Sequence, residues 1–275
     1  MAFAPATVVD PIARTALPFG LLSVVTPRPV GDSRWENGVV WEPLTCGPAS
    51  GIGEVDCDPE TPTVGLPKVM AEPGGTDDAT AFTVYGSYEC SPTGHSVEYA
   101  QQRATEHLLA REEARAEQAL WTGDLGNTPN FSGAATAAGG GFEPCLAVAT
   151  AEQYIAASYG SLGVIHMSRL LAQVLLCEEA LEVRGNRLFT RLGTPVVAGA
   201  GYPGTHPDGV TPGEWLVVTP ALMAYRSEIF TATNRPGDLL DRGQNNLFGV
   251  AERRYLIGYD ECPPILAVEV ELVVV

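Results

Sequence analysis

The clearest pattern of apolar and polar positions lies in residues 95–122. This stretch contains no glycine or proline and is rich in Ala, Glu, Gln, Arg and Leu, which all favour helices. One shifting stripe at helical spacing is formed by Val97, Ala100, Ala104, Leu108, Arg111 and Arg115. On the polar surface, Glu113 and Glu117 lie beside Arg111 and Arg115. The pattern predicts a helix of roughly 40 Å, longer than usual.

The first 30 residues are apolar and interrupted by prolines. At this density prolines prevent a helix and discourage a central strand. Full exposure of the apolar side chains would invite aggregation. These side chains include Val8, Val9, Leu17, Phe19, Leu21, Leu22, Val24 and Val25. We therefore expect an extended segment that lies against its own domain or a neighbour, rather than a frayed terminus.

Two strand patterns flank a long segment that has no periodic apolar face. Residues 38–41 form the first pattern, and the β-branched and aromatic alternation of residues 80–89 forms the second. Residues 46–79 between them are rich in Gly, Pro, Asp and Glu. A loop of this length inside a compact domain is unusual and is often functional. We interpret it as an arm that reaches outward.

The remaining sequence predicts a Gly- and Ala-rich linker at 123–145, followed by a compact α/β unit. Helices are predicted at 149–159 and 169–179. The second helix is expected to turn four side chains inward, namely Leu170, Leu171, Val174 and Leu175. Strands or extended segments are predicted at 163–167, 187–190, 194–199, 215–218, 220–233, 248–258 and 264–274, with a bend at 234–238.

Composition indicates a globular chain with enough residues for one large domain or two small ones. Hydrophobic residues make up 45 % and charged residues 18 % of the 275 positions. The net charge of −17 argues against nucleic-acid recognition, which needs clustered Lys and Arg, but not against enclosing nucleic acid. Lys68 is the single lysine; abundant arginine suits subunit contacts, although a GC-rich genome would also explain it. Neither a secretory signal nor a membrane span is expected.

No motif predicts a catalytic, cofactor or metal site. The six cysteines form no CxxC pair and no two histidines lie three to five residues apart, so zinc patterns are absent. Residues 199–204 match GxGxxG, but Pro203 and the lack of a following helix indicate a turn. No GxSxG sequence occurs. Mostly free thiols are expected at Cys46, Cys57, Cys90, Cys145, Cys177 and Cys262.

The isolated histidine, cysteine and lysine side chains show no pattern that is typical of a reactive group. The histidines are scattered at His95, His107, His166 and His206. His166 lies in an apolar strand pattern and is expected to be a hydrogen-bonded core side chain. Cys145 or Cys177 would need a partner histidine to act as a nucleophile. Lys68 is expected to be an ordinary solvated side chain on the outward loop.

The order of these elements resembles the HK97-like capsid fold of tailed phages, with an actinobacteriophage-like character, and of encapsulin nanocompartments. The order is an apolar arm, a strand–loop–strand, a long helix, a Gly-rich junction, a compact α/β unit and long closing strands. The resemblance covers nearly the whole chain. It also rests on local sequence, namely GVIHMSRLLAQVL, GTPVVAGAGYPG and AERRYLIGYDECPPILAVEVEL.

The resemblance implies an α+β fold with named parts. Residues 1–33 would be the N-terminal arm and 34–89 the extended loop. Residues 90–145 and 220–275 would form the peripheral domain, with the spine helix at 95–122. Residues 146–219 would form the axial domain, which packs around fivefold and sixfold axes.

The function implied is that of a structural subunit, not an enzyme. Pentamers and hexamers would build an icosahedral capsid around phage double-stranded DNA, assembled in the host cytoplasm and located in the virion. A separate scaffold and a decoration protein are possible partners, and no membrane is involved. Alternatives are an encapsulin-type shell, a cytoplasmic Cys- or Ser-dependent hydrolase, and another virion part such as a decoration or connector protein.

Covalent cross-linking is a further property of one branch of the resembled family. There a loop lysine joins a neighbour's asparagine in an isopeptide bond, assisted by a glutamate. Lys68 stands in a comparable region, and the partners would be Asn234, Asn245 or Asn246 with Glu252. No matching motif is present, so no cross-link is expected.

Overall fold

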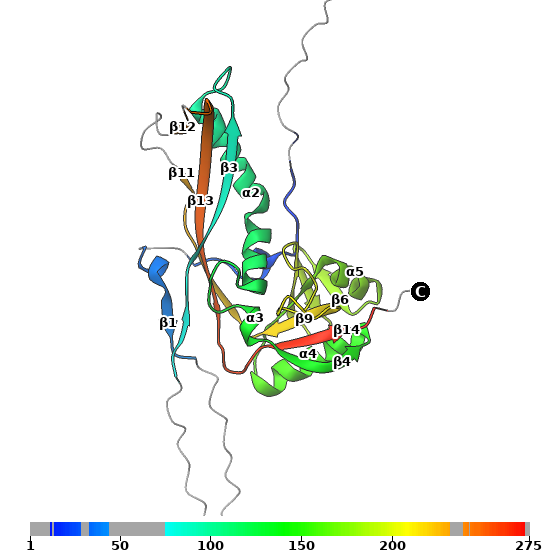
Figure 1. The fold of residues 1–275 in the computed structure, drawn as a ribbon. Helices are drawn as coiled ribbons and strands as arrows, with labels where there is room; N and C mark the ends of the chain where they lie inside the picture. The colour runs from blue at the N-terminus through cyan, green and yellow to red at the C-terminus, as the bar shows by residue number, and fades with distance from the viewer. Residues whose placement is uncertain are drawn as a thin grey trace, which may run out of the picture.

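The computed structural model describes residues 12, 14–28, 33–43, 75–231, 239–241 and 243–272. These residues form an elongated part and a compact part, which lie next to each other (Figure 1). A long helix runs beside long strands in the elongated part. The compact part is a sheet with helices packed against it.

Helix α2 (Val97–Thr122) is the backbone of the elongated part. The hydroxyl of Ser96 accepts a hydrogen bond from the Tyr99 N–H at 3.2 Å and caps the first turn. Gly123, with φ of 67°, ends the helix in the left-handed region that glycine tolerates. The predicted helix at 95–122 is therefore confirmed.

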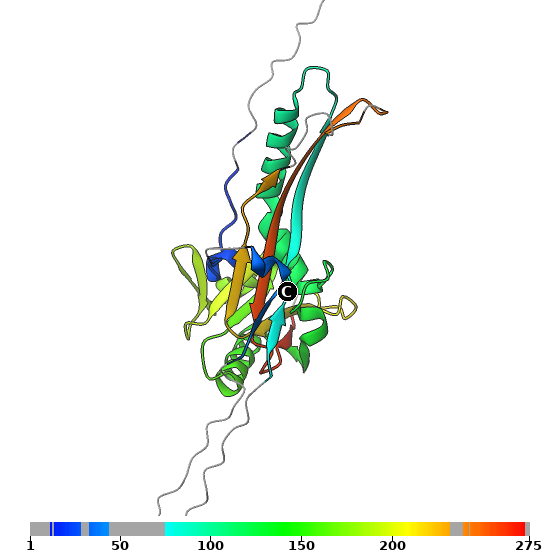
Figure 2. The ribbon, with the colours of Figure 1, turned by 90° about the vertical axis from the view of Figure 1, so that its left-hand side faces the viewer.

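The long sheet lies beside α2 and is built around β13 (Asn246–Tyr259). β13 pairs antiparallel with β3 (Phe82–Cys90), β10 (Leu222–Arg226), β11 (Phe230–Thr231) and β12 (Leu240–Asp241). Figure 2 shows β3 and β13 curving together alongside α2. The strands predicted at 80–89 and 248–258 are confirmed.

Three glycines let backbone approach α2 closely. A Cβ on Gly249 would lie 2.1 Å from the carbonyl oxygen of Ala100, and one on Gly86 would lie 2.4 Å from that of Ala104. Gly201, in the loop after β8, would meet the carbonyl oxygen of Ala114 at 1.8 Å. No side chain fits at these positions, so the glycines fix how closely the helix packs.

The large sheet forms the compact part. Within the described residues its strand order is β4-β14-β9-β5-β8-β7-β6, with parallel pairing only in β4–β14 and β5–β8. The strands are β4 (Thr136–Phe142), β5 (Val164–Ser168), β6 (Leu181–Arg184), β7 (Arg187–Thr190), β8 (Pro195–Gly199), β9 (Glu214–Thr219) and β14 (Leu266–Val270).

Alternate side chains of the large sheet point to its opposite faces, and each face packs into a different hydrophobic core. Ile165 and Leu216 pack with helices α4 (Pro144–Ser158) and α5 (Arg169–Cys177). Val164 and Val217 lie in a second core with the last turns of α2 and the short helix α3 (Phe131–Ala134). This second core also holds Ala251 and Tyr255 of β13, so it joins the compact part to the elongated part.

Short elements precede the long sheet. Helix α1 (Leu21–Val24) and the 3-10 helix η1 (Arg34–Asn37) come before a two-stranded ribbon of β1 (Val39–Trp41) and β2 (Asp77–Ala79). Trp35 stacks on Tyr225, and the Trp41 indole N–H donates to Asp260 at 2.8 Å. The strand predicted at 38–41 is confirmed. Residues 44–74 of the predicted loop and the bend at 234–238 lie outside the described residues.

Several predictions are wrong in detail. The linker expected at 123–145 contains α3 and β4, and β4 pairs parallel with β14 in the large sheet. Small side chains suit this edge strand, but their composition imitates a flexible linker. The closing strand at 264–274 therefore pairs in the compact part, not in the long sheet. β6 was not predicted, and the four-residue α1 forms despite the prolines around it.

The stripe described for α2 and the inward face predicted for α5 also need correction. On α2 the buried line continues from Leu108 through Glu112 and Ala116, not through Arg111 and Arg115, because Glu112 meets a buried arginine from β13. On α5, Leu170 is 58 % exposed, and the buried side chains are Leu171, Ala172 and Leu175. In both helices the buried side chains recur about four residues apart, which is the spacing of one helical face.

Candidate assembly site

The N-terminal arm, here residues 14–28, is held on α2 by two glutamates. Glu117 Oε1 accepts the backbone N–H of Leu21 at 2.9 Å, and Glu113 Oε1 accepts that of Leu22 at 2.8 Å. These N–H groups belong to the first turn of α1, where no intrahelical acceptor exists. The other oxygen of Glu117 accepts the N–H of Gly201 at 2.9 Å. Glu113 and Glu117 were expected on the polar surface of α2. They instead join three segments, namely α2, the arm and the loop after β8.

Further contacts fix the same arm against the compact and elongated parts. Arg169 Nη1 donates to the carbonyl of Pro18 at 2.9 Å, and the Ala198 N–H donates to that of Phe19 at 2.8 Å. Farther along, the Arg28 N–H donates to the carbonyl of Ala224 at 2.8 Å. The arm therefore lies against α2, β8 and β10. Its apolar pattern predicts such a docked segment.

The two glutamates have raised pKa values. Burial raises the pKa of Glu117 to about 7, against the opposing effect of the N–H groups of Gly201 and Leu21, and the nearby charge of Glu113 adds to the rise. Burial also raises the pKa of Glu113, while the Leu22 N–H lowers it. Glu117 is only 1 % exposed, so its charge is costly near neutral pH.

A buried ion pair ties α2 to β13. Arg253 Nη1 donates to both carboxylate oxygens of Glu112 at 2.8 Å, and Arg226 lies 3.9 Å from the same carboxylate. Burial and the Glu112 charge raise the pKa of the neighbouring Tyr255 hydroxyl. Removal of one charge would leave the other buried without a partner.

An open groove of about 690 Å³ runs along the same helix between β3, the arm and the loop after β8. Its basic lining residues are Arg14, His107, Arg111 and Arg115. Its one acidic lining residue, Glu112, already pairs with Arg253. Arg115 pairs with Asp124 at 3.0 Å, so Arg14 and Arg111 are the arginines of this lining for which no ion pair is described.

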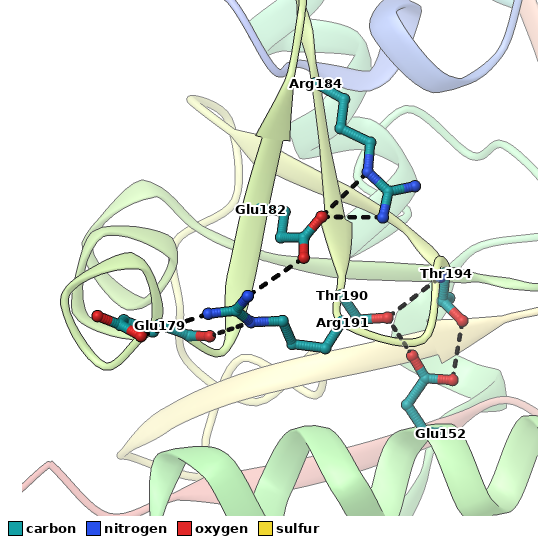
Figure 3. A network of polar contacts seen from close by, with 7 residues as sticks. All are labelled: Glu152, Glu179, Glu182, Arg184, Thr190, Arg191 and Thr194. Carbon is teal, nitrogen blue, oxygen red and sulfur yellow. Dashed lines mark hydrogen bonds and ion pairs between the residues drawn. The ribbon is translucent and has the colours of Figure 1, made fainter.

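A polar network stabilises the far end of the compact part (Figure 3). Arg191 bridges Glu182 at 3.2 Å and Glu179 at 3.4 Å, and Arg184 adds a second contact to Glu182. Beside it, Glu152 of α4 accepts the hydroxyls of Thr190 and Thr194. Leu192 in the adjacent turn is 77 % exposed, so an apolar side chain faces solvent beside these polar contacts.

His166 is a core residue, as the sequence predicts. It is fully buried, and its ring nitrogens contact the Tyr202 hydroxyl at 2.9 Å and the Thr219 hydroxyl at 3.0 Å. Burial lowers its pKa to about 3, so the ring is neutral at physiological pH. A neutral ring held between two hydroxyls orders the core and is closed to solvent.

Cys145, one of the two cysteines considered as a nucleophile, has a raised thiol pKa. The Cys145 thiol contacts Glu178 at 3.5 Å, and burial together with this carboxylate raises its pKa. A raised pKa disfavours the nucleophilic thiolate. Cys90, Cys145 and Cys177 are free thiols, whereas Cys46 and Cys57 lie outside the described residues.

The residues weighed for cross-linking are only partly described. Lys68 and Asn234 lie outside the described residues. Asn246 donates to Glu89 of β3, Asn245 sits in the turn before β13 with φ of 54°, and Glu252 pairs with Phe230 in the ladder. Within the described ranges no three His, Cys, Asp or Glu side chains gather as a metal site would require, and no helix there is long and apolar enough to cross a membrane.

Comparison with known proteins gives a structural likeness. No family model and no curated protein matches the sequence. A solved structure from Mycobacterium phage Bobi aligns with a TM-score of 0.56 at 14 % identity, covering 98 % of this chain and 96 % of that chain. The capsid of a native GTA particle, computed with C5 symmetry, aligns with a TM-score of 0.59 at 11 % identity over the same shares. The fold is that of a capsid protein.

A third structure agrees. One from Microbacterium phage Oxtober96 aligns with a TM-score of 0.56 at 12 % identity, covering 98 % of this chain and 96 % of that chain. Such low identities establish the fold and no individual residue role. The sequence reasoning missed the Glu113–Glu117 junction and the Glu112–Arg253 pair, because nothing in a charged helix marks which carboxylates face inward.

Proposed function

We propose that the chain is a structural subunit that self-assembles into the icosahedral capsid shell of a tailed phage, around double-stranded DNA. The observation that carries the proposal is the alignment of nearly the whole chain with phage and capsid structures. A partial match could reflect one common supersecondary unit. A match over 98 % of this chain and 96 % of the other includes the arm, the long helix and both sheets.

We propose the division that the HK97-like resemblance implies, with one adjustment. Residues 1–33 would be the N-terminal arm, 34–89 the extended loop and α2 the spine helix. The peripheral domain would consist of α2 with β10, β11, β12 and β13, and the axial domain of the large sheet with α4 and α5. Residues 136–142 and 266–270 belong to the axial domain, because β4 and β14 pair there.

The surface supports contacts with several neighbours. Large apolar side chains are exposed at separate places, such as Tyr85 of β3 at 67 % and Val210 in the loop before β9 at 85 %. The basic groove along α2 offers Arg14 and Arg111 to an acidic partner, and the chain itself is acidic. Pentamers and hexamers of identical subunits would use such patches as many small contacts, which together stabilise a shell.

The remaining roles follow from this proposal. The subunit belongs to the virion, assembles in the host cytoplasm, acts without a cofactor or catalytic residue, and works with a separate scaffold and a decoration protein. An encapsulin-type shell shares the fold but needs a cargo peptide inside. For the Cys- or Ser-dependent hydrolase, the raised pKa of Cys145 is an unfavourable sign.

Electron microscopy of the purified full-length chain tests the proposal. The expected result is closed shells of uniform diameter that sediment far faster than a 29.0 kDa monomer. Coexpression with the phage scaffold, where the genome supplies one, is the matched second condition. A monodisperse monomer under both conditions would contradict the proposal.

A further inference from the structure

The contact between the arm and α2 brings two carboxylates to one point. Glu113 and Glu117 lie one helical turn apart and face Gly20 of the arm. A Cβ on Gly20 would lie 2.4 Å from Glu113 Oε1 and 3.0 Å from Glu117 Oε1. Both carboxylates therefore surround the same piece of arm backbone, and only glycine leaves room for them.

The groups packed around this point leave the negative charges poorly compensated. Arg111 and Arg169 line the same small cavity, but Arg169 donates to the carbonyls of Pro18 and Ala198. From the loop after β8, the Tyr202 hydroxyl contacts His166. From β10, Arg226 lies 3.9 Å from Glu112 and its charge lowers the pKa of Glu113 in part, whereas the Glu112 charge raises it. The hydrogen-bond donors at this point are the backbone N–H groups of Leu21, Leu22 and Gly201, with a further contribution from Ala200, and none of these groups carries a formal charge.

We propose that Glu113 and Glu117 form a latch, which holds the N-terminal arm on α2 while one of the two carboxyls is protonated and loosens when that proton is lost. Two carboxylates at one buried point cannot both ionise without repulsion, so one keeps its proton. The docked arm contributes to the burial of both carboxylates, because Gly20, Leu21 and Leu22 lie against them. Loss of the proton puts a second charge into the same site and weakens docking.

The direction of the pH effect follows from the linkage between proton binding and docking. Burial raises the pKa of Glu117 from 4.5 to about 7 in the docked state. The docked carboxyl thus binds its proton more tightly than the free one, so docking is strongest below about pH 4.5 and weakens as the pH rises towards 7. These two values correspond to docking roughly tenfold weaker at pH 8 than at pH 6.

Backbone strain in the docked arm also favours its release. Phe19 has φ of 70°, a left-handed conformation that a bulky side chain rarely adopts. The contacts of Pro18, Phe19, Leu21 and Leu22 hold it there. Release of the latch would free this residue. The use of a released arm for a neighbouring subunit rests on the proposed shell function, whereas the latch itself does not.

Hydrogen–deuterium exchange on the full-length chain at pH 6 and pH 8 tests the latch. After correction for the intrinsic exchange rate, the amides of Leu21 and Leu22 should lose roughly tenfold in protection at pH 8. The Thr136 amide, which donates to the carbonyl of Ile265 outside the arm, should not change. A flat profile for the arm, or an equal loss at Thr136, would overturn the proposal.

Three variants separate charge from hydrogen bonding. Glu113→Gln keeps an acceptor for Leu22 and removes the repelling charge, so the arm should lose less protection at pH 8 than it does in the wild type. Glu117→Gln leaves one acceptor for two N–H groups, so protection should be low at both pH values. Glu106→Gln, on an exposed turn of α2, is the control and should match the wild type. Wild-type behaviour in Glu113→Gln would also overturn the latch.

Electron microscopy of the same samples separates the two proposals. A latch that responds to pH in a chain that never assembles would contradict the shell function alone. Shells whose arm amides ignore pH would contradict the latch alone.

Discussion

Arg253 Nη1 lies 2.8 Å from both carboxylate oxygens of Glu112, and this contact ties β13 to α2. Arg253→Met should lower the free energy of unfolding by about 3–5 kcal/mol, because it leaves the Glu112 charge buried with only the more distant Arg226 nearby. Urea denaturation of the unassembled chain measures the loss. Arg184→Met, which breaks an exposed pair with Glu182, should cost far less stability than Arg253→Met, because solvent screens exposed charges. Equal losses in both variants would contradict the structural role given to Glu112.

The close approach of α2 to the long sheet gives a second prediction. Gly86→Ala would place a Cβ 2.4 Å from the carbonyl oxygen of Ala104, and it should cost about 1–3 kcal/mol through forced displacement of the helix. Gly133→Ala is the matched control, because nothing lies within 4 Å of its Cβ position. Thermal unfolding compares the two. A Gly86→Ala melting temperature as high as that of the control would show that the packing is looser than described.

The neutral core histidine predicts acid sensitivity. Burial lowers the pKa of His166 to about 3, below its ordinary value of 6.5, so the unfolded chain binds a proton that the folded chain does not. Stability should therefore fall as the pH drops below 6.5, by about 2 kcal/mol between pH 7 and pH 5. His166→Gln should remove this part of the pH dependence, and His95→Gln, at an exposed position, should keep it. Identical pH slopes in the two variants would rule out His166 as the cause.

Cross-linking has a simple test. No motif around Lys68, Asn245 or Asn246 supports an isopeptide bond, so boiled particles should migrate in SDS gels at the monomer mass only. Lys68→Arg, which cannot form the bond, should give the same pattern. A ladder of multiples in the wild type that disappears in this variant would overturn the expectation.

Most of the fold could be predicted because local signals and tertiary packing agree. Helix α2 has strong helix formers, a Ser96 cap and Gly123 at its end, and β3 alternates as a half-buried strand should. The core role of His166 followed from its apolar neighbours. These features depend on residues close together in the sequence.

The remaining features depend on distant partners. β4 was missed because its small residues act as an edge strand only when β14 lies beside them. Glu113 and Glu117 look like surface charges until Leu21, Leu22 and Gly201, far away in the sequence, supply their hydrogen bonds. Arg111 and Glu112 are neighbours on one helix, and only Arg253 decides which faces inward. No periodicity encodes such long-range pairings.

Cryo-electron microscopy of the purified full-length chain is the most direct test of the shell function. The account predicts closed icosahedral particles, in which copies of this fold surround fivefold and sixfold axes, with the compact part nearest each axis. An open filament, or a soluble monomer that never assembles with or without a scaffold, would contradict it.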